Sequence, residues 1–162
     1  MARRARYWMN CATNSERSVI VYVESSAVLA WLLGESSELG VRRALDGADR
    51  VVTSALTGVE CARALTRARL QSRISPVEEL AALQLLQRSE STWDVHAITD
   101  SVLLRARSPM PGDPVRTLDA LHVATMTVLR ESVGPLAVLS LDDRVRACAV
   151  ALGFAVLPEA HV

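Results

Sequence analysis

The stretch Val19-Ile-Val-Tyr-Val-Glu-Ser-Ser-Ala-Val-Leu-Ala-Trp-Leu-Leu-Gly34 decides the fold. Its first five residues are apolar and mostly β-branched, which predicts a short buried strand. Three polar residues follow, Glu24 to Ser26, and then residues 27–33 are all apolar and predict a helix that ends at Gly34. A buried strand that leads straight into a helix is typical of a parallel sheet.

The rest of the chain repeats this alternation of strand and helix. We expect further strands at 50–53, 93–96, 136–139 and 154–157, and helices at 37–46, 55–70, 76–88, 100–107, 117–130 and 142–152. Such alternation predicts an α/β fold, a three-layer α/β/α sandwich around a central parallel sheet. In sheets of this kind, functional sites lie at the carboxyl ends of the strands.

Size and composition limit the classes of function. The chain has 162 residues, enough for one domain, and half of them are apolar. The 18 basic residues, all arginine, balance 18 acids, so bulk charge gives no indication of a nucleic-acid binder, although a local basic patch is compatible with it. Aromatic residues make up only 4%, which argues against a stacking platform for single strands.

The cysteines and the N-terminus indicate a cytoplasmic protein. Cys11, Cys61 and Cys148 form no CxxC pair, which excludes a zinc knuckle or a thioredoxin motif and favours a reducing compartment. No apolar stretch is long enough to span a membrane. Residues 1–17 lack the apolar core of a secretory signal. We interpret them as a disordered extension before a domain at 18–162, with a basic arm that touches RNA as the alternative.

Four acids stand in places where solvation alone does not explain them. Glu24 and Asp142 directly follow predicted strands, where an α/β site is expected. Glu60 and Asp119 lie inside helices among small and apolar residues, and the helix around Asp119 is apolar nearly all round. Independent chance does not readily explain two acids at strand ends together with two acids on apolar helices.

Each acid also has a simpler interpretation. Asp142 and Asp119 lie near helix starts, where carboxylates are stabilised by the helix dipole. Glu24 would then be a turn residue. Glu60 would pair with an arginine one or two turns along its own helix.

Together, however, the four acids point to a metal. A buried carboxylate costs several kcal/mol unless it is paired, protonated or bound to a metal. Carboxylates that gather in one place repel each other, and a divalent cation removes that penalty. Oxygen ligands suit Mg²⁺ or Mn²⁺, which also bind phosphate oxygens and activate water. The residues therefore predict a metal-dependent phosphodiester hydrolase.

The same residues lie in four stretches that resemble the motifs of PIN-domain proteins. Order and spacing match across about residues 19–158, and the third motif is the most specific. The stretches are Val21-Tyr-Val-Glu-Ser-Ser-Ala-Val-Leu29, Glu60-Cys-Ala-Arg-Ala-Leu65, Arg116-Thr-Leu-Asp-Ala-Leu-His-Val-Ala-Thr125 and Ser140-Leu-Asp142.

Small members of this family resemble the toxin component of bacterial VapBC toxin–antitoxin pairs. The resemblance implies a PIN-like fold and an endoribonuclease that cleaves structured RNA, such as tRNA or rRNA, with Mg²⁺ or Mn²⁺. It implies a homodimer and a VapB-type antitoxin that blocks the acidic site. The complex with antitoxin would be a heterotetramer or larger and would reach operator DNA only through the antitoxin.

The resemblance also implies roles for individual residues. Four carboxylates would form the catalytic metal cluster, and two small polar residues would hold a metal-bound water. The carboxylates are Glu24, Glu60, Asp119 and Asp142, and the polar residues are Ser26 and Ser140.

Glu24 departs from the family pattern, and His122 lies close to one of the four acids in the sequence. The family usually has Asp where this chain has Glu24, whose carboxylate reaches about 1.5 Å farther. We expect the backbone or a bridging water to adapt, although the change would favour Mn²⁺ or lower the activity, because Mg²⁺ is strict about geometry. His122 follows Asp119 by three residues on the same helical side, and we interpret it as a structural histidine with a satisfied hydrogen bond.

Two other functions compete with the nuclease. A catalytically weakened PIN-like module would act through binding of antitoxin and nucleic acid, and Glu24 is the feature that favours it. A doubly wound hydrolase with Asp142 as its nucleophile would leave Glu60 and Asp119 unexplained.

Overall fold

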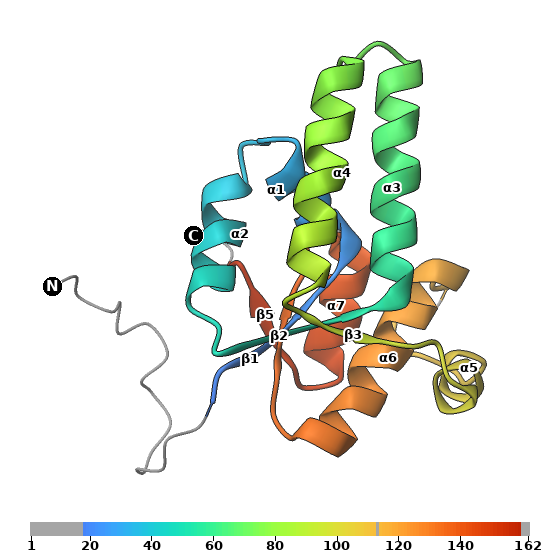
Figure 1. Cartoon of the computed structure of the whole chain (residues 1–162). Helices are drawn as coiled ribbons and strands as arrows, with labels where there is room; N and C mark the ends of the chain where they lie inside the picture. Colours follow the sequence, from blue (N-terminus) through green and yellow to red (C-terminus); the bar gives the residue numbers. More distant parts are fainter. Residues whose placement is uncertain (1–17, 113, 160–162) are drawn as a thin grey trace, which may run out of the picture.

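The computed structural model describes residues 18–112 and 114–159, so the expectation for residues 1–17 lies outside the described residues. Strands and helices alternate along the chain as predicted (Figure 1). The elements are β1 (Ile20–Val23), α1 (Ser25–Leu32), α2 (Glu38–Asp46), β2 (Arg50–Ser54), α3 (Ala55–Leu70), α4 (Pro76–Glu90), β3 (Asp94–His96), α5 (Asp100–Ala106), α6 (Thr117–Val133), β4 (Ala137–Leu139), α7 (Asp143–Ala151) and β5 (Ala155–Leu157).

The strands form one five-stranded sheet in the order β3-β2-β1-β4-β5. Every neighbouring pair is parallel, with Val23 opposite Thr53 of β2 on one side and Leu139 of β4 on the other. The predicted parallel sheet is therefore confirmed. Its first strand lies at the centre, as expected for the most apolar strand of the chain.

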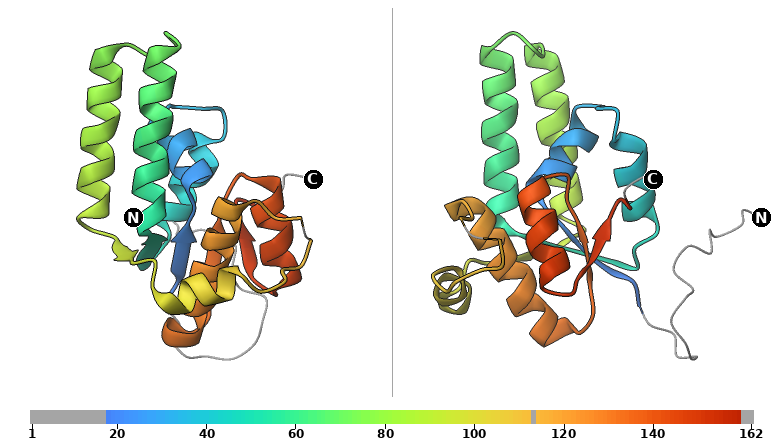
Figure 2. Two further views of the ribbon diagram at one scale, coloured as in Figure 1. Left: turned by 90° about the vertical axis from the view of Figure 1, so that its right-hand side faces the viewer. Right: turned by 180° about the vertical axis from the view of Figure 1, so that it is seen from behind.

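Helices cover both faces of the sheet, which confirms the three-layer sandwich. Tyr22, Val52 and Val138 pack against α5, α6 and α7, whereas Val21 and Val23 pack on the opposite face against α1 to α4. The left view of Figure 2 shows α3 and α4 on one side of β1 and α6 and α7 on the other. Cys61 and Cys148 are buried, one in each layer of core, where each packs as a small apolar residue.

Helix boundaries differ from the predicted ones by a few residues. Helix α1 begins at Ser25, because Glu24 has the extended backbone of a residue that precedes a helix. Helix α6 continues three residues past the expected end, to Val133, and stops at Gly134, whose φ of 84° suits glycine. Among the described residues, no helix combines the length and the apolar character needed to cross a membrane.

The pairing of β1 with β4 creates the point where the chain reverses its direction of winding. After β1 the chain enters α1 on one face of the sheet, and after β4 it enters α7 on the other. The backbone N–H of Glu24 donates to the carbonyl oxygen of Leu139 at 3.0 Å, which holds the two strand ends side by side. Ligand sites in open α/β sheets occur outside the carboxyl ends of the strands at such a point.

Arg146 of α7 anchors the neighbouring strand ends. Its guanidinium donates to the carbonyl oxygens of Ser140 at 2.8 Å, Leu157 at 3.0 Å and Pro158 at 2.9 Å. Hydrogen bonds from a charged donor are stronger than those between neutral groups. Arg146 therefore fixes the segments after β4 and β5 to the helix that packs on them.

Replacing Arg146 tests this anchor. Arg146→Ala removes a charged donor from three carbonyls, of which that of Leu157 keeps the backbone N–H of Ser140, and we expect a loss of about 2–3 kcal/mol in the free energy of unfolding. Thermal unfolding should show a fall in Tm of about 5–10 °C. Arg63→Ala, at an exposed position on α3, is the control and should leave Tm nearly unchanged. Equal Tm values for the two variants would contradict the anchoring role.

Candidate active site

Glu24 is the most deeply buried of the four predicted acids, with 4% of its surface exposed. Three serine hydroxyls donate to its carboxylate. Ser25 donates to Oε1 at 2.6 Å, Ser140 donates to Oε2 at 2.8 Å, and Ser26 also donates to Oε2. These charge-assisted hydrogen bonds compensate for the loss of water around a buried carboxylate.

Ser26 and Ser140 also connect the segments that follow β1 and β4. The hydroxyl oxygen of Ser26 accepts from the backbone N–H groups of Leu141 at 2.8 Å and Asp142 at 3.1 Å. The hydroxyl oxygen of Ser140 accepts from the N–H of Asp142 at 3.2 Å. Ser26 and Ser140 therefore position Glu24 and Asp142 relative to each other, in addition to the water-holding role that the resemblance implies for them.

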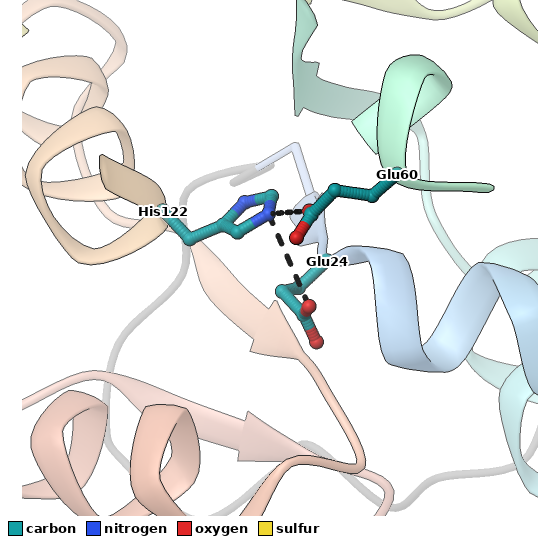
Figure 3. Close-up of side chains that lie close together, drawn as sticks. All are labelled: Glu24, Glu60 and His122. Atoms are coloured by element: carbon teal, nitrogen blue, oxygen red, sulfur yellow. Dashed lines mark hydrogen bonds and ion pairs between the residues drawn. The ribbon is translucent and has the colours of Figure 1, made fainter. Parts of the chain in front are cut away.

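Glu60 reaches the site from α3 and meets His122 from α6, on the other side of β1. The His122 ring nitrogen Nε2 lies 2.6 Å from Oε2 of Glu60 and 4.0 Å from Oε1 of Glu24 (Figure 3). On the other side of the ring, Nδ1 lies 2.8 Å from the hydroxyl of Tyr22, a fully buried residue of β1. Three elements far apart in the sequence thus converge on one imidazole.

The pKa values indicate which of these groups carry protons. Burial acts to raise the pKa of Glu60, but its hydrogen bond and electrostatic interaction with His122 outweigh burial and hold this pKa below its ordinary value. Burial raises the pKa of Tyr22 well above its ordinary value, and the charges of Glu24 and Glu60 add to this rise. At neutral pH, Glu60 is therefore ionised and Tyr22 keeps its proton.

Asp142 and Asp119 are the other two predicted acids, and they differ in their partners. Asp142 caps α7, because its Oδ1 accepts from the N–H groups of Arg144 at 2.9 Å and Val145 at 3.1 Å. Asp119 lies in the first turn of α6, and its buried Oδ2 has no hydrogen-bond partner among the described residues. Helix capping thus accounts for part of the role of Asp142, whereas Asp119 holds an unsatisfied acceptor.

The pKa of Asp119 is raised by burial and by the charges of other acids. Burial raises this pKa, and the charges of Asp142 and Glu24 raise it further, while those of Arg116 and Arg144 lower it in part. Asp119 is therefore a carboxyl group that the metal-free fold holds at an energetic cost. The two arginines are exposed and lie near enough for their charge to act on the site.

The structure thus brings the predicted acids to one end of the sheet. Glu24 and Glu60, with His122, offer ligand atoms that all lie within 4.8 Å of one another. Glu60 pairs with His122 and not with Arg63 or Arg67 of its own helix. Among the described residues, Asp119 and Asp142 are not part of this close group; the charges of Asp142 and Glu24 nevertheless act on Asp119 and raise its pKa.

His122 is the residue whose place in the site sequence reasoning missed. It is buried with both ring nitrogens in hydrogen bonds, as expected for a structural histidine, but one partner is a predicted site residue. Its position one turn after Asp119 was the signal that could have identified it, because both side chains project from the same side of the helix. Nothing in the sequence indicated that Glu60 would come to meet it.

Comparison with known proteins decides the family. The model of the PIN domain matches residues 21–151. This chain belongs to the PIN domain family. Ribonuclease VapC46 of Mycobacterium tuberculosis is 33% identical to it over 137 residues, which cover 85% of this chain and 95% of that protein.

Two solved structures share the fold of this PIN domain. One is VapC20 of Mycobacterium tuberculosis, described as a sarcin-ricin loop cleaving toxin, with a TM-score of 0.60 and 20% identity over 85% of this chain and 99% of that one. The other is a toxin–antitoxin complex from Klebsiella pneumoniae, with a TM-score of 0.61 and 13% identity over 88% of this chain and 99% of that one. At these identities the likeness supports the fold.

The site residues of this PIN domain fit a divalent cation. The donor set is rich in carboxylate oxygens, which Mg²⁺ and Mn²⁺ prefer. The buried Oδ2 of Asp119 lacks a partner, and the charges around it oppose its ionisation. A cation would satisfy this oxygen and remove the repulsion from Asp142 and Glu24.

Asp119→Asn tests this electrostatic account in the metal-free protein. Because the pKa of Asp119 is raised in the fold, its contribution to stability is present at low pH and is lost as pH rises through that pKa. In EDTA at pH 7 we therefore expect the variant to have a Tm equal to or above that of the wild type, with the difference closing toward pH 4. Added Mn²⁺ should raise the Tm of the wild type but not that of Asp119→Asn.

Asp143→Asn is the matched control, because Asp143 is the exposed first residue of α7 beside Asp142. This variant should keep the Mn²⁺ response. A lower Tm for Asp119→Asn in EDTA, with an undiminished response to Mn²⁺, would show that Asp119 is an ordinary helix-start carboxylate.

Proposed function

We propose that this protein is a metal-dependent endoribonuclease and the toxin component of a type II toxin–antitoxin system, with structured RNA such as tRNA or rRNA as its substrate. The observation that carries the proposal is the close approach of the Glu24 and Glu60 carboxylates at the β1/β4 end. It is joined by Asp119, whose buried Oδ2 lacks a partner among the described residues and whose pKa is raised by the charges of Asp142 and Glu24. The relationship to ribonuclease VapC46 supports it.

The carboxylates of Glu24, Glu60 and Asp119 would hold Mg²⁺ or Mn²⁺, with Asp142 beside them. When bound, the cation supplies an activated water and neutralises charge on the phosphate. Ser26 and Ser140 keep the Glu24 carboxylate in one orientation through their hydroxyl groups. Asp142 combines two tasks, since Oδ1 caps α7 while its charge adds to the acidic cluster.

Two arginines beside the acidic site would bind the phosphates of the substrate. Arg116 precedes α6 and Arg144 lies in the first turn of α7, so the two cations approach Asp119 from different segments. Exposed arginines next to a carboxylate cluster suit an RNA backbone, because they bind the phosphates that the acids alone would repel. This local pair supplies positive charge that the balanced net charge of the chain does not show.

The proposed partners follow from the same assignment. A VapB-type antitoxin would cover the acidic site, and the toxin–antitoxin complex from Klebsiella pneumoniae with the same fold supports this partner. We propose a homodimer that forms a heterotetramer or larger assembly with the antitoxin and reaches operator DNA through it. An RNA substrate of this kind places the protein in the cytoplasm.

The test is cleavage of total bacterial RNA by the purified protein freed of antitoxin, in Mg²⁺ and in Mn²⁺. We expect discrete cuts that disappear with EDTA. Asp119→Asn should lower the cleavage rate by at least about 100-fold, because loss of one ligand disturbs both the cation and the water it activates. Asp143→Asn should cleave at the wild-type rate.

Undiminished cleavage in EDTA would exclude the metal from the mechanism. A folded wild-type protein that makes no cuts in either metal would favour the binding module over the nuclease. Glu24→Asp would then ask whether the additional methylene group of Glu24 had silenced the site. Recovery of cleavage in that variant would assign the loss to this one position.

A further inference from the structure

His122 is a buried residue to which the proposed nuclease reaction assigns no task. Its side chain is about 1% exposed, and its ring connects the Tyr22 hydroxyl with the Glu60 carboxylate. Its Nε2 lies 2.6 Å from Oε2 of Glu60, a carboxylate of the proposed cation site.

The chemistry of the partners fixes the direction of both hydrogen bonds. A carboxylate has only acceptor oxygens, so across the 2.6 Å contact with Oε2 of Glu60 the Nε2 of His122 is the donor and carries the proton. In the neutral ring Nδ1 is then an acceptor, and the protonated hydroxyl of Tyr22 donates to it. Tyr22 therefore selects the tautomer that places a donor against Glu60.

This arrangement restricts the orientation of the Glu60 carboxylate. Its side chain has three rotatable bonds and is 21% exposed, and it reaches the cluster from α3 across to the side of α6. The hydrogen bond to Nε2 occupies Oε2 and holds the carboxylate next to Glu24, with Oε1 left as the second acceptor oxygen. A nitrogen that carries this proton has no lone pair for a cation.

We infer that His122 is a positioning residue, held in its tautomer by Tyr22, that orients Glu60 for divalent-cation binding without being a ligand itself. The inference rests on the proposed metal-dependent nuclease. Groups that hydrogen-bond to metal ligands typically change metal affinity by about 10–100-fold when they are lost. His122 thus sets how strongly this site holds its cation.

Two substitutions of similar polarity separate the two ends of the ring. The amide nitrogen of glutamine is as many bonds from Cβ as Nε2, so His122→Gln keeps a donor for Glu60. The amide of asparagine matches only Nδ1, so His122→Asn keeps a partner for Tyr22 and loses the bond to Glu60. Tyr22→Phe removes the hydroxyl that selects the tautomer.

The measurement is Mn²⁺ affinity by calorimetric titration, with kcat and KM for RNA cleavage at saturating Mn²⁺ as the second readout. We expect His122→Gln to bind Mn²⁺ within about threefold of wild type and His122→Asn to bind about 10–100-fold more weakly. Tyr22→Phe should show a smaller loss. At saturating Mn²⁺, His122→Asn should lower kcat with little change in KM.

Several results would overturn the inference. Unchanged Mn²⁺ affinity in His122→Asn would do so, and so would a loss in His122→Gln as large as that in His122→Asn. Histidine nitrogen coupling to bound Mn²⁺ in pulsed electron paramagnetic resonance would make His122 a ligand instead. In ¹⁵N-histidine spectra of the metal-free protein, the tautomer with its proton on Nδ1 would contradict the assigned direction.

The same titration distinguishes failure of the proposed function from failure of the inference about His122. A wild-type protein that binds no Mn²⁺ would remove the cation site, so the proposed function and this inference would both fall. A wild type that binds Mn²⁺ and cleaves RNA, together with an unaffected His122→Asn, would leave the proposed function standing and remove the inference alone.

Discussion

The parallel pairing of β1 with β4 is the constraint on which the site depends. It brings the ends of two strands together although more than a hundred residues separate them, and it directs the following helices to opposite faces of the sheet. Glu24 and Asp142 meet because each directly follows its strand or nearly so. Helices α3 and α6 then add Glu60 and Asp119 from either side, so the acidic cluster is a consequence of topology.

The fold compensates for these acids unequally. Glu24 receives three hydroxyl donors, Glu60 receives His122, and Asp142 receives the N–H groups at the start of α7. Asp119 is left with an unsatisfied oxygen and a raised pKa. Proteins tolerate such a deficit where binding or catalysis uses it. In this PIN domain, a bound cation would supply the partner that Asp119 lacks.

The sequence predicted most of the fold because local signals and global topology agree. The apolar run 19–23 identified the central strand, and Gly34 marked the end of the first helix correctly to within a few residues. The role of His122 depended on a contact with Glu60 across 62 positions, which helical spacing does not reveal. Likewise, the three serines around Glu24 lie at the start of α1 and directly after β4, two segments that only the β1–β4 pairing brings together.

The most direct test of the account is a crystal structure with Mn²⁺, in which anomalous scattering locates the ion. The account predicts one or two peaks at the β1/β4 end, with oxygens of Glu24, Glu60 and Asp119 at coordination distances of about 2.0–2.5 Å. Peaks confined to other parts of the molecule, with this cluster empty at saturating Mn²⁺, would contradict it.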